Sequence, residues 1–329
     1  MLRLFALEAT RPFGKRVAEA LGLPLTPHEE REFEDGEHKS RPLAPVRGAD
    51  AYVIQSLHGG PAASANDKLI RLLFFLSTLR QNGARRVTAV IPYLAYARKD
   101  RQTKPRDPVN TRYVAELLEA AGADALLTID VHNIVAFQNA FRRDAWHLDT
   151  RRLFIDHLLP SLGHEQRLAV ASPDPGGVKR AQLFREKLEE IIGCETGTAL
   201  MEKRRSAGKV SGTYLAGAVE GAIVLVVDDL ISSGGTMTRA AEALLQNGAE
   251  SVIAIACHGL FTGDAEDKLQ SQHIARWLVT DTVPFFRLPA NLADKRIETV
   301  SAAPLFAEAI RRLYENGSLV DLLEGSEEG

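Results

Sequence analysis

A motif that ends a helix and starts a buried strand recurs along this chain. Gln-Asn-Gly-Ala occurs at 81–84 and again at 246–249, half a chain length apart. An apolar run follows each copy, RRVTAVIPY at 85–93 and ESVIAIACH at 250–258. Glycine is expected just past a helix end, and helices that alternate with continuous apolar strands indicate parallel sheets built from right-handed βαβ units. The sequence therefore predicts an α/β protein with two similar halves.

Length and composition limit the classes of protein to which this chain can belong. Its 329 residues favour two domains, because single hydrophobic cores stop growing near roughly 250–300 residues. The 40 basic and 43 acidic residues leave a net charge of −3, which gives no overall attraction to nucleic acid or to a membrane surface. Apolar runs are only strand-length, and Cys194 and Cys257 are expected to be buried thiols. We expect a cytoplasmic protein with no membrane or nucleic-acid partner.

The segment 222–247, AIVLVVDDLISSGGTMTRAAEALLQN, combines a strand, a tight turn and a helix. The strand delivers Asp228 and Asp229 to the carboxyl edge of a sheet, where open α/β folds bind ligands. Gly234 and Gly235 let the backbone approach an anion, and hydroxyls together with helix N-terminal N–H groups hold a phosphate. Carboxylates beside such a turn suit a sugar phosphate, although acids that merely cap a helix give a similar pattern.

The first half contains a counterpart of this segment that lacks the acids. AYVIQSLHGG at 51–60 again runs from a strand into a glycine pair, but Gln55 and Ser56 stand where the second half has Asp228 and Asp229. We infer a duplicated domain in which only the C-terminal copy kept a sugar-phosphate loop.

Three further polar segments are candidate phosphate or nucleotide sites. FEDGE at 33–37 places an aromatic ring and acids on a short turn, which suits binding of a base but also fits an ordinary acidic turn. IPYLAYARKDRQTKPRDP at 91–108 runs from a strand into a basic loop, which fits a polyphosphate clamp, a nucleic-acid patch or a solvated face. MEKRRSAGK at 201–209 is predicted to be a mobile basic loop that closes over phosphates, or else a solvated loop.

Two strand ends carry acids that suit a magnesium-bound nucleotide. TIDVHN at 128–133 places Asp130 and His132 after one strand, and SPDPGG at 172–177 places Asp174 after another. Mg²⁺ binds few carboxylates together with waters and phosphate oxygens. A strand-end histidine is also common in purely structural roles, so the Mg²⁺ site depends on these residues meeting at one sheet edge.

In this order, the segments resemble the ribose-phosphate pyrophosphokinase family, whose members make 5-phosphoribosyl-1-diphosphate (PRPP). The matching strings are FEDGE, YARKDR, TIDVH, SPDPGGVKR, EKRR and VVDDLISSGGT, and the resemblance runs from LFALEAT near the start to LFAEAIRR near the end. It implies an α/β fold of two duplicated phosphoribosyltransferase-type domains, each with a mostly parallel sheet flanked by helices. The expected domains are 1–149, a degenerate copy with ATP-binding segments, and 150–303, with the ribose 5-phosphate loop and the catalytic loop. Residues 304–329 are expected to form a helix that packs back on the first domain and a disordered tail.

The resemblance implies transfer of the β,γ-diphosphoryl group of ATP to the C1 hydroxyl of ribose 5-phosphate, giving PRPP and AMP, with Mg²⁺ as cofactor. It assigns catalysis to Lys203 and Arg205, and metal binding to His132 and Asp174. The implied ATP-binding residues are Phe33, Asp35, Glu37, Arg98, Lys99, Asp100 and His132. The implied ribose 5-phosphate residues are Asp228, Asp229, Ser232, Ser233, Gly234, Gly235 and Thr236. Self-association as a dimer or hexamer is also implied, with the 33–37 turn reaching the active site of a neighbouring subunit.

Several positions depart from the family's pattern. Ser232 replaces an aspartate after the acid pair, and Lys99 stands where a glutamine is usual. Pro45, Pro105 and Ile134 stand where many members have serines that line an allosteric phosphate and ADP site. Because proline and isoleucine side chains donate no hydrogen bond, we predict weak or absent activation by phosphate and altered inhibition by ADP.

Two other functions fit part of the pattern. A phosphoribosyltransferase would share the loop at 222–247 but would need an acceptor-base pocket in place of FEDGE and EKRR. A non-catalytic regulatory paralogue would be favoured by loss of Lys203, Arg205 or His132, and all three are present.

Overall fold

The computed structural model describes most of the chain. The structure describes residues 1–163, 166–206 and 209–324. Within this part, the side chains of 201–216 are not described. The tail at 325–329, which we expected to be disordered, lies outside the described residues.

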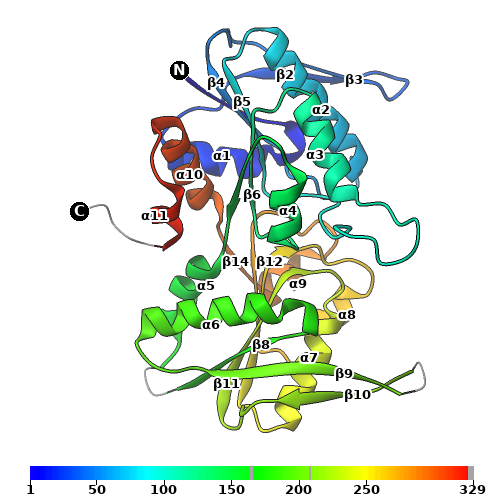
Figure 1. Ribbon diagram of the computed structural model, residues 1–329, viewed down its shortest axis with the longest axis vertical. Coiled ribbons are helices and arrows are strands. Elements are labelled where there is room, and N and C mark those ends of the chain that lie inside the picture. The colour runs from blue at the N-terminus through cyan, green and yellow to red at the C-terminus, as the bar shows by residue number, and fades with distance from the viewer. Residues whose placement is uncertain (164–165, 207–208, 325–329) are drawn as a thin grey trace. The chain divides into compact units, whose positions relative to one another are not determined.

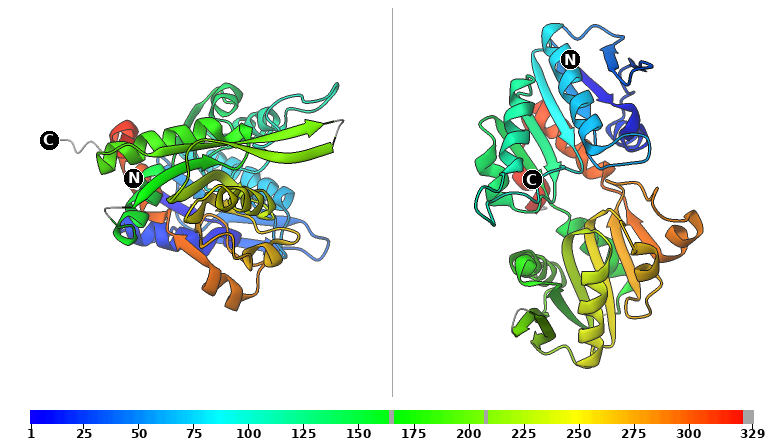
Figure 2. Two further views of the ribbon diagram at one scale, coloured as in Figure 1. Left: turned by 90° about the horizontal axis from the view of Figure 1, so that it is seen from below. Right: turned by 90° about the vertical axis from the view of Figure 1, so that its right-hand side faces the viewer.

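Two compact units make up the chain (Figure 1, Figure 2). The first unit comprises Met1–Asp149 together with the segment from Ser301 onward, and the second comprises Thr150–Val300. Each unit has its own sheet and its own hydrophobic core.

Five parallel strands form the sheet of the first unit. They are rich in buried Val, Ile, Leu and Ala, as expected for a parallel sheet that is covered on both faces. The inner strand β4 pairs with β1 and β5, so that Val53 lies beside Phe5 and Ala89. In spatial order the strands are β1 (Leu2–Ala6), β4 (Asp50–Ile54), β5 (Arg86–Ile91), β6 (Ala125–Ile129) and β7 (Asp144–Leu148).

Helices cover both faces of this sheet. One face forms a core with α2 (Ala65–Gln81), α3 (Asn110–Ala120) and α4 (Ile134–Ala140). On the other face lies α1 (Arg11–Leu21), where any side chain on Gly14 would overlap the Cβ of Ala6, so glycine allows this close approach.

The last long helix of the chain packs on the first unit. The rings of Phe13 in α1 and Phe306 in α10 (Ala303–Glu315) meet edge to face, with centroids 5.6 Å apart. The short helix α11 (Leu319–Glu324) follows α10. Residues at both ends of the described chain therefore contribute to one core.

A two-stranded antiparallel hairpin lies outside this sheet. It consists of β2 (His28–Glu32) and β3 (His38–Pro42), and β3 lies against α2. The FEDGE segment at 33–37 is the turn that joins the two strands. The turn was expected from the sequence, and the flanking strands were not.

Seven strands form the sheet of the second unit. All neighbours are parallel except β10, which is antiparallel to β9. In spatial order they are β10 (Lys209–Ala216), β9 (Gly197–Ser206), β8 (Arg167–Ser172), β11 (Ala222–Ile231), β12 (Ser251–Gly259), β13 (Arg276–Thr280) and β14 (Ile297–Val300).

The side chains of β11 alternate between two cores. Val224 and Val226 pack in the core that contains α7, whereas Leu225 and Val227 pack in the core that contains α5 and α6. β11 is thus buried on both faces, and its carboxyl end is fixed in place. The helices of this unit are α5 (Arg151–Leu158), α6 (Val178–Ile192), α7 (Gly235–Gln246), α8 (Ala265–Leu269) and α9 (Ala290–Arg296).

The predicted α/β architecture with two mostly parallel sheets is confirmed. Two local predictions are wrong. The stretch predicted as a basic loop is strand β9 as far as Ser206, because β10 supplies its backbone hydrogen-bond partners whatever the polarity of its side chains. Cys194 is exposed, since it follows Gly193, which ends α6 at the surface, whereas Cys257 is buried. Within the described residues, no helix is long and apolar enough to span a membrane.

Candidate functional site

Two adjacent carboxylates lie near the carboxyl end of β11. The side chain of Asp228 is 23% exposed and that of Asp229 is 5% exposed. Arg180 of α6 contacts both, with its Nη1 3.2 Å from Asp228 Oδ1 and 3.3 Å from Asp229 Oδ1. One guanidinium therefore holds the two carboxylates together, and Asp228 retains access to solvent.

The proton affinity of Asp228 is unusually high. Burial and the charge of Asp229 raise the pKa of Asp228 above its usual range, and the attraction of Arg180 offsets this only in part. Hydrogen-bond donors from a ligand would favour the ionised carboxylate. Sugar hydroxyls are donors of this kind, so the pair suits a polyhydroxy ligand.

The turn after β11 leaves the N-terminus of α7 without a side-chain cap from the described residues. Gly234 has a φ of 82°, a left-handed conformation that glycine adopts without strain. A Cβ added there would lie 3.3 Å from the Cβ of Lys268 and 3.3 Å from the ring of Trp277, so the turn is also closely packed. Uncapped N–H groups and the helix dipole at such a terminus attract phosphate.

The hydroxyl groups on this turn have different partners. The Ser232 and Thr262 hydroxyls share a hydrogen bond of 2.9 Å, and the Thr262 N–H donates to the Ser232 carbonyl oxygen at 2.8 Å. Arg239 Nη2 donates to Thr236 Oγ1 at 3.3 Å. Ser233 is half-buried beside Gly234. Ser232 is thus held by the loop after β12, and no sequence pattern had pointed to Thr262.

Asp174 caps a tight turn at the end of β8. Its Oδ1 accepts a hydrogen bond of 2.9 Å from the Gly176 N–H, and Ser172 Oγ donates to the Asp174 carbonyl oxygen at 2.6 Å. Because β8 pairs in parallel with β11, Asp174 and Asp228 lie at the same edge of the second sheet.

The basic loop that follows β5 is folded around Asp107. The Asp107 carboxylate accepts hydrogen bonds from Lys99 Nζ at 2.5 Å and from Thr103 Oγ1 at 2.7 Å, and also from the N–H groups of Thr103 and Lys104. These hydrogen bonds lower the pKa of Asp107. Arg98 is exposed beside them. Lys99 therefore already has a partner within its own loop.

The end of β6 lies close to this loop. Asn133 Nδ2 donates to Asp100 Oδ2 at 2.7 Å, and its Oδ1 caps α4. Asp130 has a φ of 43°, which is rare for a residue other than glycine and concentrates at functional sites. His132, between them, is exposed. The structure thus brings Asp100 and the 130–133 segment together in the first unit.

The 33–37 turn presents Phe33 at the tip of the hairpin, where it is 39% exposed. The Phe33 N–H donates to the Glu37 carbonyl oxygen at 2.8 Å, and the Glu37 N–H donates to Asp35 Oδ1 at 3.1 Å. The Arg31 guanidinium lies 5.0 Å from the centre of the Phe33 ring. The tip is well formed and accessible to a ligand or a second chain.

Three features bear on the other predicted residues. Lys203 and Arg205 belong to β9, and their side chains lie outside what the structure describes. Asp130 and His132 follow β6 of the first sheet, whereas Asp174 follows β8 of the second, so the expectation that they meet at one sheet edge is wrong. Among the described residues, no group of three or more His, Cys, Asp or Glu side chains forms a metal site. The predicted Mg²⁺ ligands therefore stay a prediction.

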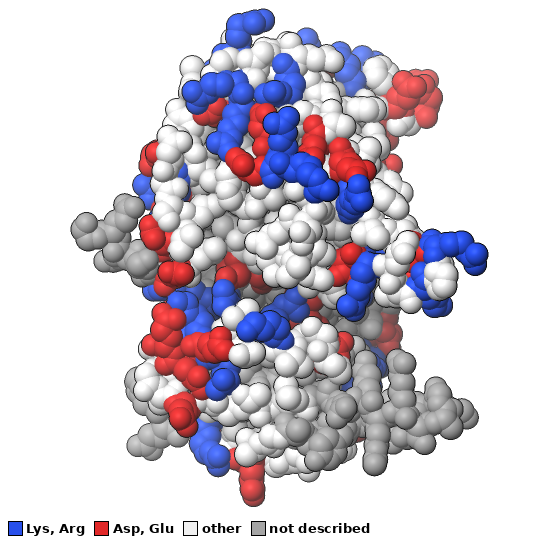
Figure 3. All heavy atoms as spheres, viewed as in Figure 1, with Lys and Arg blue, Asp and Glu red and all other residues white. Residues whose placement is uncertain are grey.

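Arg180 is the main contact that reasoning from the sequence missed. It follows the SPDPGG segment within the first turn of α6, and its role depends on the pairing of β8 with β11. Charges elsewhere are mixed: on the face shown in Figure 3, acidic and basic side chains are interspersed.

Comparisons with known proteins agree with this arrangement. Residues 2–122 match the N-terminal domain of ribose phosphate pyrophosphokinase, and residues 203–324 match the phosphoribosyl synthetase-associated domain. The ribose-phosphate pyrophosphokinase of Caldanaerobacter subterraneus is 38% identical over 323 residues, which cover 98% of this chain and 97% of the relative. That of Aquifex aeolicus is 35% identical over 321 residues, 98% of each.

A solved structure is also similar. The crystal structure of phosphoribosylpyrophosphate synthetase from Mycobacterium smegmatis has a TM-score of 0.84 to this chain at 33% identity, covering 96% of this chain and 99% of that one. Sequence and fold therefore agree over almost the full length. The chain belongs to the ribose-phosphate pyrophosphokinase family.

Proposed function

We propose that this chain transfers the β,γ-diphosphoryl group of ATP to the C1 hydroxyl of ribose 5-phosphate. The C1 oxygen forms a bond to the β-phosphorus, the bond from that phosphorus to the α,β-bridging oxygen breaks, and AMP leaves with the bridging oxygen. The hydroxyl proton passes to solvent. The observation that carries this proposal is the Asp228–Asp229 pair beside the N-terminus of α7, which no described side chain caps, in a chain of this family.

The second unit would bind ribose 5-phosphate. Asp228 and Asp229 accept hydrogen bonds from the ribose hydroxyls, which favours the ionised form of the buried pair. The 5-phosphate occupies the N-terminus of α7, where backbone N–H groups point outward. The residues proposed for the phosphate are Ser232, Ser233, Gly234, Gly235 and Thr236. Ser232 contributes least, because its hydroxyl already has Thr262 as a partner.

The first unit would bind ATP. Phe33 stacks on the adenine, Asp35 and Glu37 accept hydrogen bonds from its amine, and this tip serves a neighbouring subunit. The phosphates are bound by the exposed residues Arg98 and His132, with Lys99 and Asp100 shaping the loop. Lys99 must leave Asp107, 2.5 Å away, before it can contact a phosphate.

Lys203 and Arg205 are proposed as the catalytic cations. They neutralise charge on the diphosphoryl group as it moves between oxygens, and each such donor contributes on the order of 10²–10³ in rate. Mg²⁺ would arrive with ATP and would neutralise phosphate charge. Asp174 and His132 suit it, because Mg²⁺ needs few protein ligands when waters and phosphate oxygens complete its shell.

Self-association is proposed from exposed apolar side chains on α2 and α3. Ile70 and Phe74 are one turn apart on α2 and are 46% and 57% exposed, and Tyr113 and Leu117 are one turn apart on α3 and are 49% and 47% exposed. We propose that the chain forms a dimer or a hexamer. Light scattering would measure the mass of the assembly in solution. A monomer at micromolar concentration would contradict the proposal. A cytoplasmic location stays a prediction.

Weak activation by phosphate is proposed from Pro45, Pro105 and Ile134. Pro45 and Ile134 are exposed and offer no side-chain donor to an anion. Activity in a zwitterionic buffer should change little when phosphate is added, and the response to ADP should differ from that of phosphate-activated relatives. An absolute requirement for phosphate would contradict this proposal.

The test of the function is release of AMP from ATP in the presence of ribose 5-phosphate. Lys203→Ala should lower turnover by about 10²–10³ while ribose 5-phosphate still binds. Lys295→Ala, an exposed lysine of α9, is the matched control and should retain activity. Wild-type protein that released no AMP would point instead to a phosphoribosyltransferase or a regulatory paralogue. Near-normal turnover by Lys203→Ala would exclude Lys203 from the mechanism.

A further inference from the structure

The face of the β2–β3 hairpin that packs against the rest of the first unit is polar. Strand alternation and register place His28, Glu30 and Glu32 on one face with His38 and Ser40 of the opposite strand. On that face the side chains of His28, Glu30 and His38 are only 3%, 12% and 9% exposed. Strands that pack on a protein core normally present apolar residues, so ionisable groups here call for a specific explanation.

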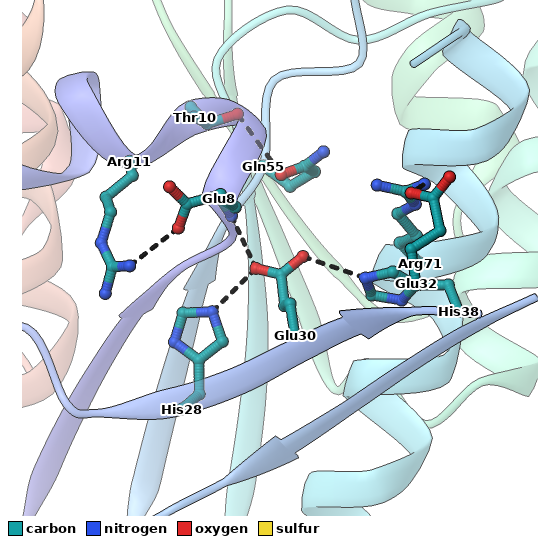
Figure 4. Close-up of polar contacts among 9 residues, drawn as sticks. All are labelled: Glu8, Thr10, Arg11, His28, Glu30, Glu32, His38, Gln55 and Arg71. Atoms are coloured by element: carbon teal, nitrogen blue, oxygen red, sulfur yellow. Dashed lines mark hydrogen bonds and ion pairs between the residues drawn. The ribbon is translucent and has the colours of Figure 1, made fainter. Parts of the chain in front are cut away.

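Glu30 is the centre of this buried cluster (Figure 4). Its Oε1 accepts hydrogen bonds from the Glu8 backbone N–H at 2.6 Å and from His28 Nε2 at 2.8 Å. Its Oε2 lies 3.3 Å from His38 Nε2. The carboxylate thus links both strands of the hairpin to the segment that follows β1.

Both histidines contact Glu30 through the same ring nitrogen. Both direct Nε2 at Glu30, and the buried Nδ1 atoms of His28 and His38 have no hydrogen-bond partner among the described residues. Burial and the charge of Arg71 lower the pKa of His38. Burial alone would raise the pKa of Glu30, but hydrogen bonds from His28 and from the Glu8 N–H lower it overall. The Glu30 carboxylate is therefore held in its ionised form by contacts with two imidazole Nε2 atoms and one backbone N–H.

The cluster is directly connected to the hairpin tip. His38 follows Glu37, and Glu32, which precedes Phe33, pairs with Arg71 of α2 at 2.7 Å. The His28 ring packs against Phe75 of α2, with centroids 5.4 Å apart. An isolated two-stranded hairpin is marginally stable in water. The position of the tip therefore depends on these contacts.

We propose that Glu30, held by His28 and His38, is a positioning residue that sets the place of the 33–37 tip and thereby the affinity for ATP. This inference rests on the proposed function, in which Phe33, Asp35 and Glu37 bind adenine. It goes beyond that function by assigning a role to a cluster for which the proposed function has none. The groups that face Glu30 are His28 and His38 of the hairpin and the backbone of Glu8, with Arg71 and Glu32 beside them.

Steady-state kinetics of Glu30→Gln test the inference. The amide keeps the size of the side chain but loses the charge and one acceptor. We expect the KM for ATP to rise by about tenfold, with kcat and the KM for ribose 5-phosphate within about twofold of wild type. The matched control is Glu29→Gln, because Glu29 lies on the outer face of the same strand and pairs with Arg41 at 2.6 Å. It should leave all constants within about twofold.

A second readout does not depend on activity. Amide hydrogen exchange of peptides within 28–42 should be faster in Glu30→Gln than in Glu29→Gln, with exchange in the second unit unchanged. If the wild type made no PRPP, the proposed function would fail and the exchange result would still report whether the cluster holds the hairpin. Equal exchange in the two variants, or equal KM values for ATP, would overturn the inference.

His38 provides a pair of variants in case Glu30→Gln does not fold. The amide nitrogen of glutamine lies close to where His38 Nε2 donates, whereas asparagine is too short to reach Glu30. His38→Gln should keep the wild-type KM for ATP, and His38→Asn should raise it by several-fold. The same KM for both variants would contradict a role for this donor.

Discussion

The ends of β4 and β11 occupy matching places in the two halves of the chain, and their polar groups have different partners. After β4, Gln55 and Ser56 are each 1% exposed. The Thr10 hydroxyl donates to Gln55 Oε1 at 3.3 Å and accepts from the Ser56 N–H at 2.9 Å, and the Tyr93 N–H donates to Ser56 Oγ at 3.3 Å. In β11, the two carboxylates contact the guanidinium of Arg180, and Asp228 is accessible.

The helices that follow differ in the same way. The N-terminus of α2 carries a capping box, in which Ser64 accepts from the Asp67 N–H at 3.2 Å and the Asp67 carboxylate accepts from the Ser64 N–H at 2.7 Å. Gly234 precedes the first residue of α7, and within the part of the chain that the structure describes no side chain caps this N-terminus. The start of α2 is capped by side chains of its own unit, whereas the start of α7 has no such cap among the described residues and is where we propose that a phosphate binds.

Removal of a carboxylate from the Asp228–Asp229 pair should have the largest effect on activity. Asp229→Ala should lower kcat/KM for ribose 5-phosphate by on the order of 10³, because a proposed hydroxyl contact and the geometry of the acid pair around Arg180 are lost together. Gln55→Ala, at the matching strand end, should leave kcat/KM within about twofold and should lower the free energy of unfolding by about 1–3 kcal/mol. Steady-state kinetics and thermal melting measure both. Similar loss of activity in the two variants would remove the contrast between the halves.

A side chain added at Gly234, on the turn before α7, should reduce activity less than the loss of a carboxylate does. Gly234→Ala places a Cβ at a φ of 82° and 3.3 Å from Lys268 and Trp277, so the turn must shift. We expect the KM for ribose 5-phosphate to rise by roughly tenfold. Gly193→Ala is the control, because Gly193 has a φ of 73° with open space around it, and it should affect stability alone. An unchanged KM in Gly234→Ala would mean that phosphate does not bind at this turn.

Loss of the cap on α2 should affect stability only. Ser64→Ala should lower the free energy of unfolding by about 1 kcal/mol, since the Asp67 N–H loses its acceptor. Kinetic constants should not change, because we assign no ligand to this helix end. Denaturant unfolding and an AMP-release assay measure the two quantities, and a change in the KM for ribose 5-phosphate would show that the first copy still binds substrate.

The two units should respond to pH in opposite directions. The raised pKa of Asp228 gives stability that is present below its usual value of 3.8 and is lost as pH rises through the raised pKa. The lowered pKa values of Glu30 and His38 give stability that is present above their usual values of 4.5 and 6.5 and is lost as pH falls. Acidification from about pH 8 to about pH 5 should therefore speed exchange near 28–42, through His38 alone, and slow it near 222–236, after correction for intrinsic rates. Asp228→Asn should abolish the second change, and a uniform response would contradict the assignment.

The sequence predicted what is local and periodic. Glycines that end helices, continuous apolar strands and the Asp-Asp and Gly-Gly pairs on one strand and turn were sufficient for the α/β architecture and for the proposed ribose 5-phosphate site. Arg180 was missed because its partners are 48 and 49 positions away and meet it only when β8 pairs with β11. The hairpin was missed because its inner face is made of histidine and glutamate, which give no apolar alternation. Strand β9 was missed for the same reason, because its charged residues, which pair with β10, also give no apolar alternation.

Calorimetric titration of ribose 5-phosphate is the decisive measurement, because one half of the chain should bind the sugar and the other should not. We predict one site per chain, lost in Asp229→Ala and unchanged in Gln55→Ala. Two sites per chain, or binding that survives Asp229→Ala and disappears in Gln55→Ala, would contradict this division between the halves.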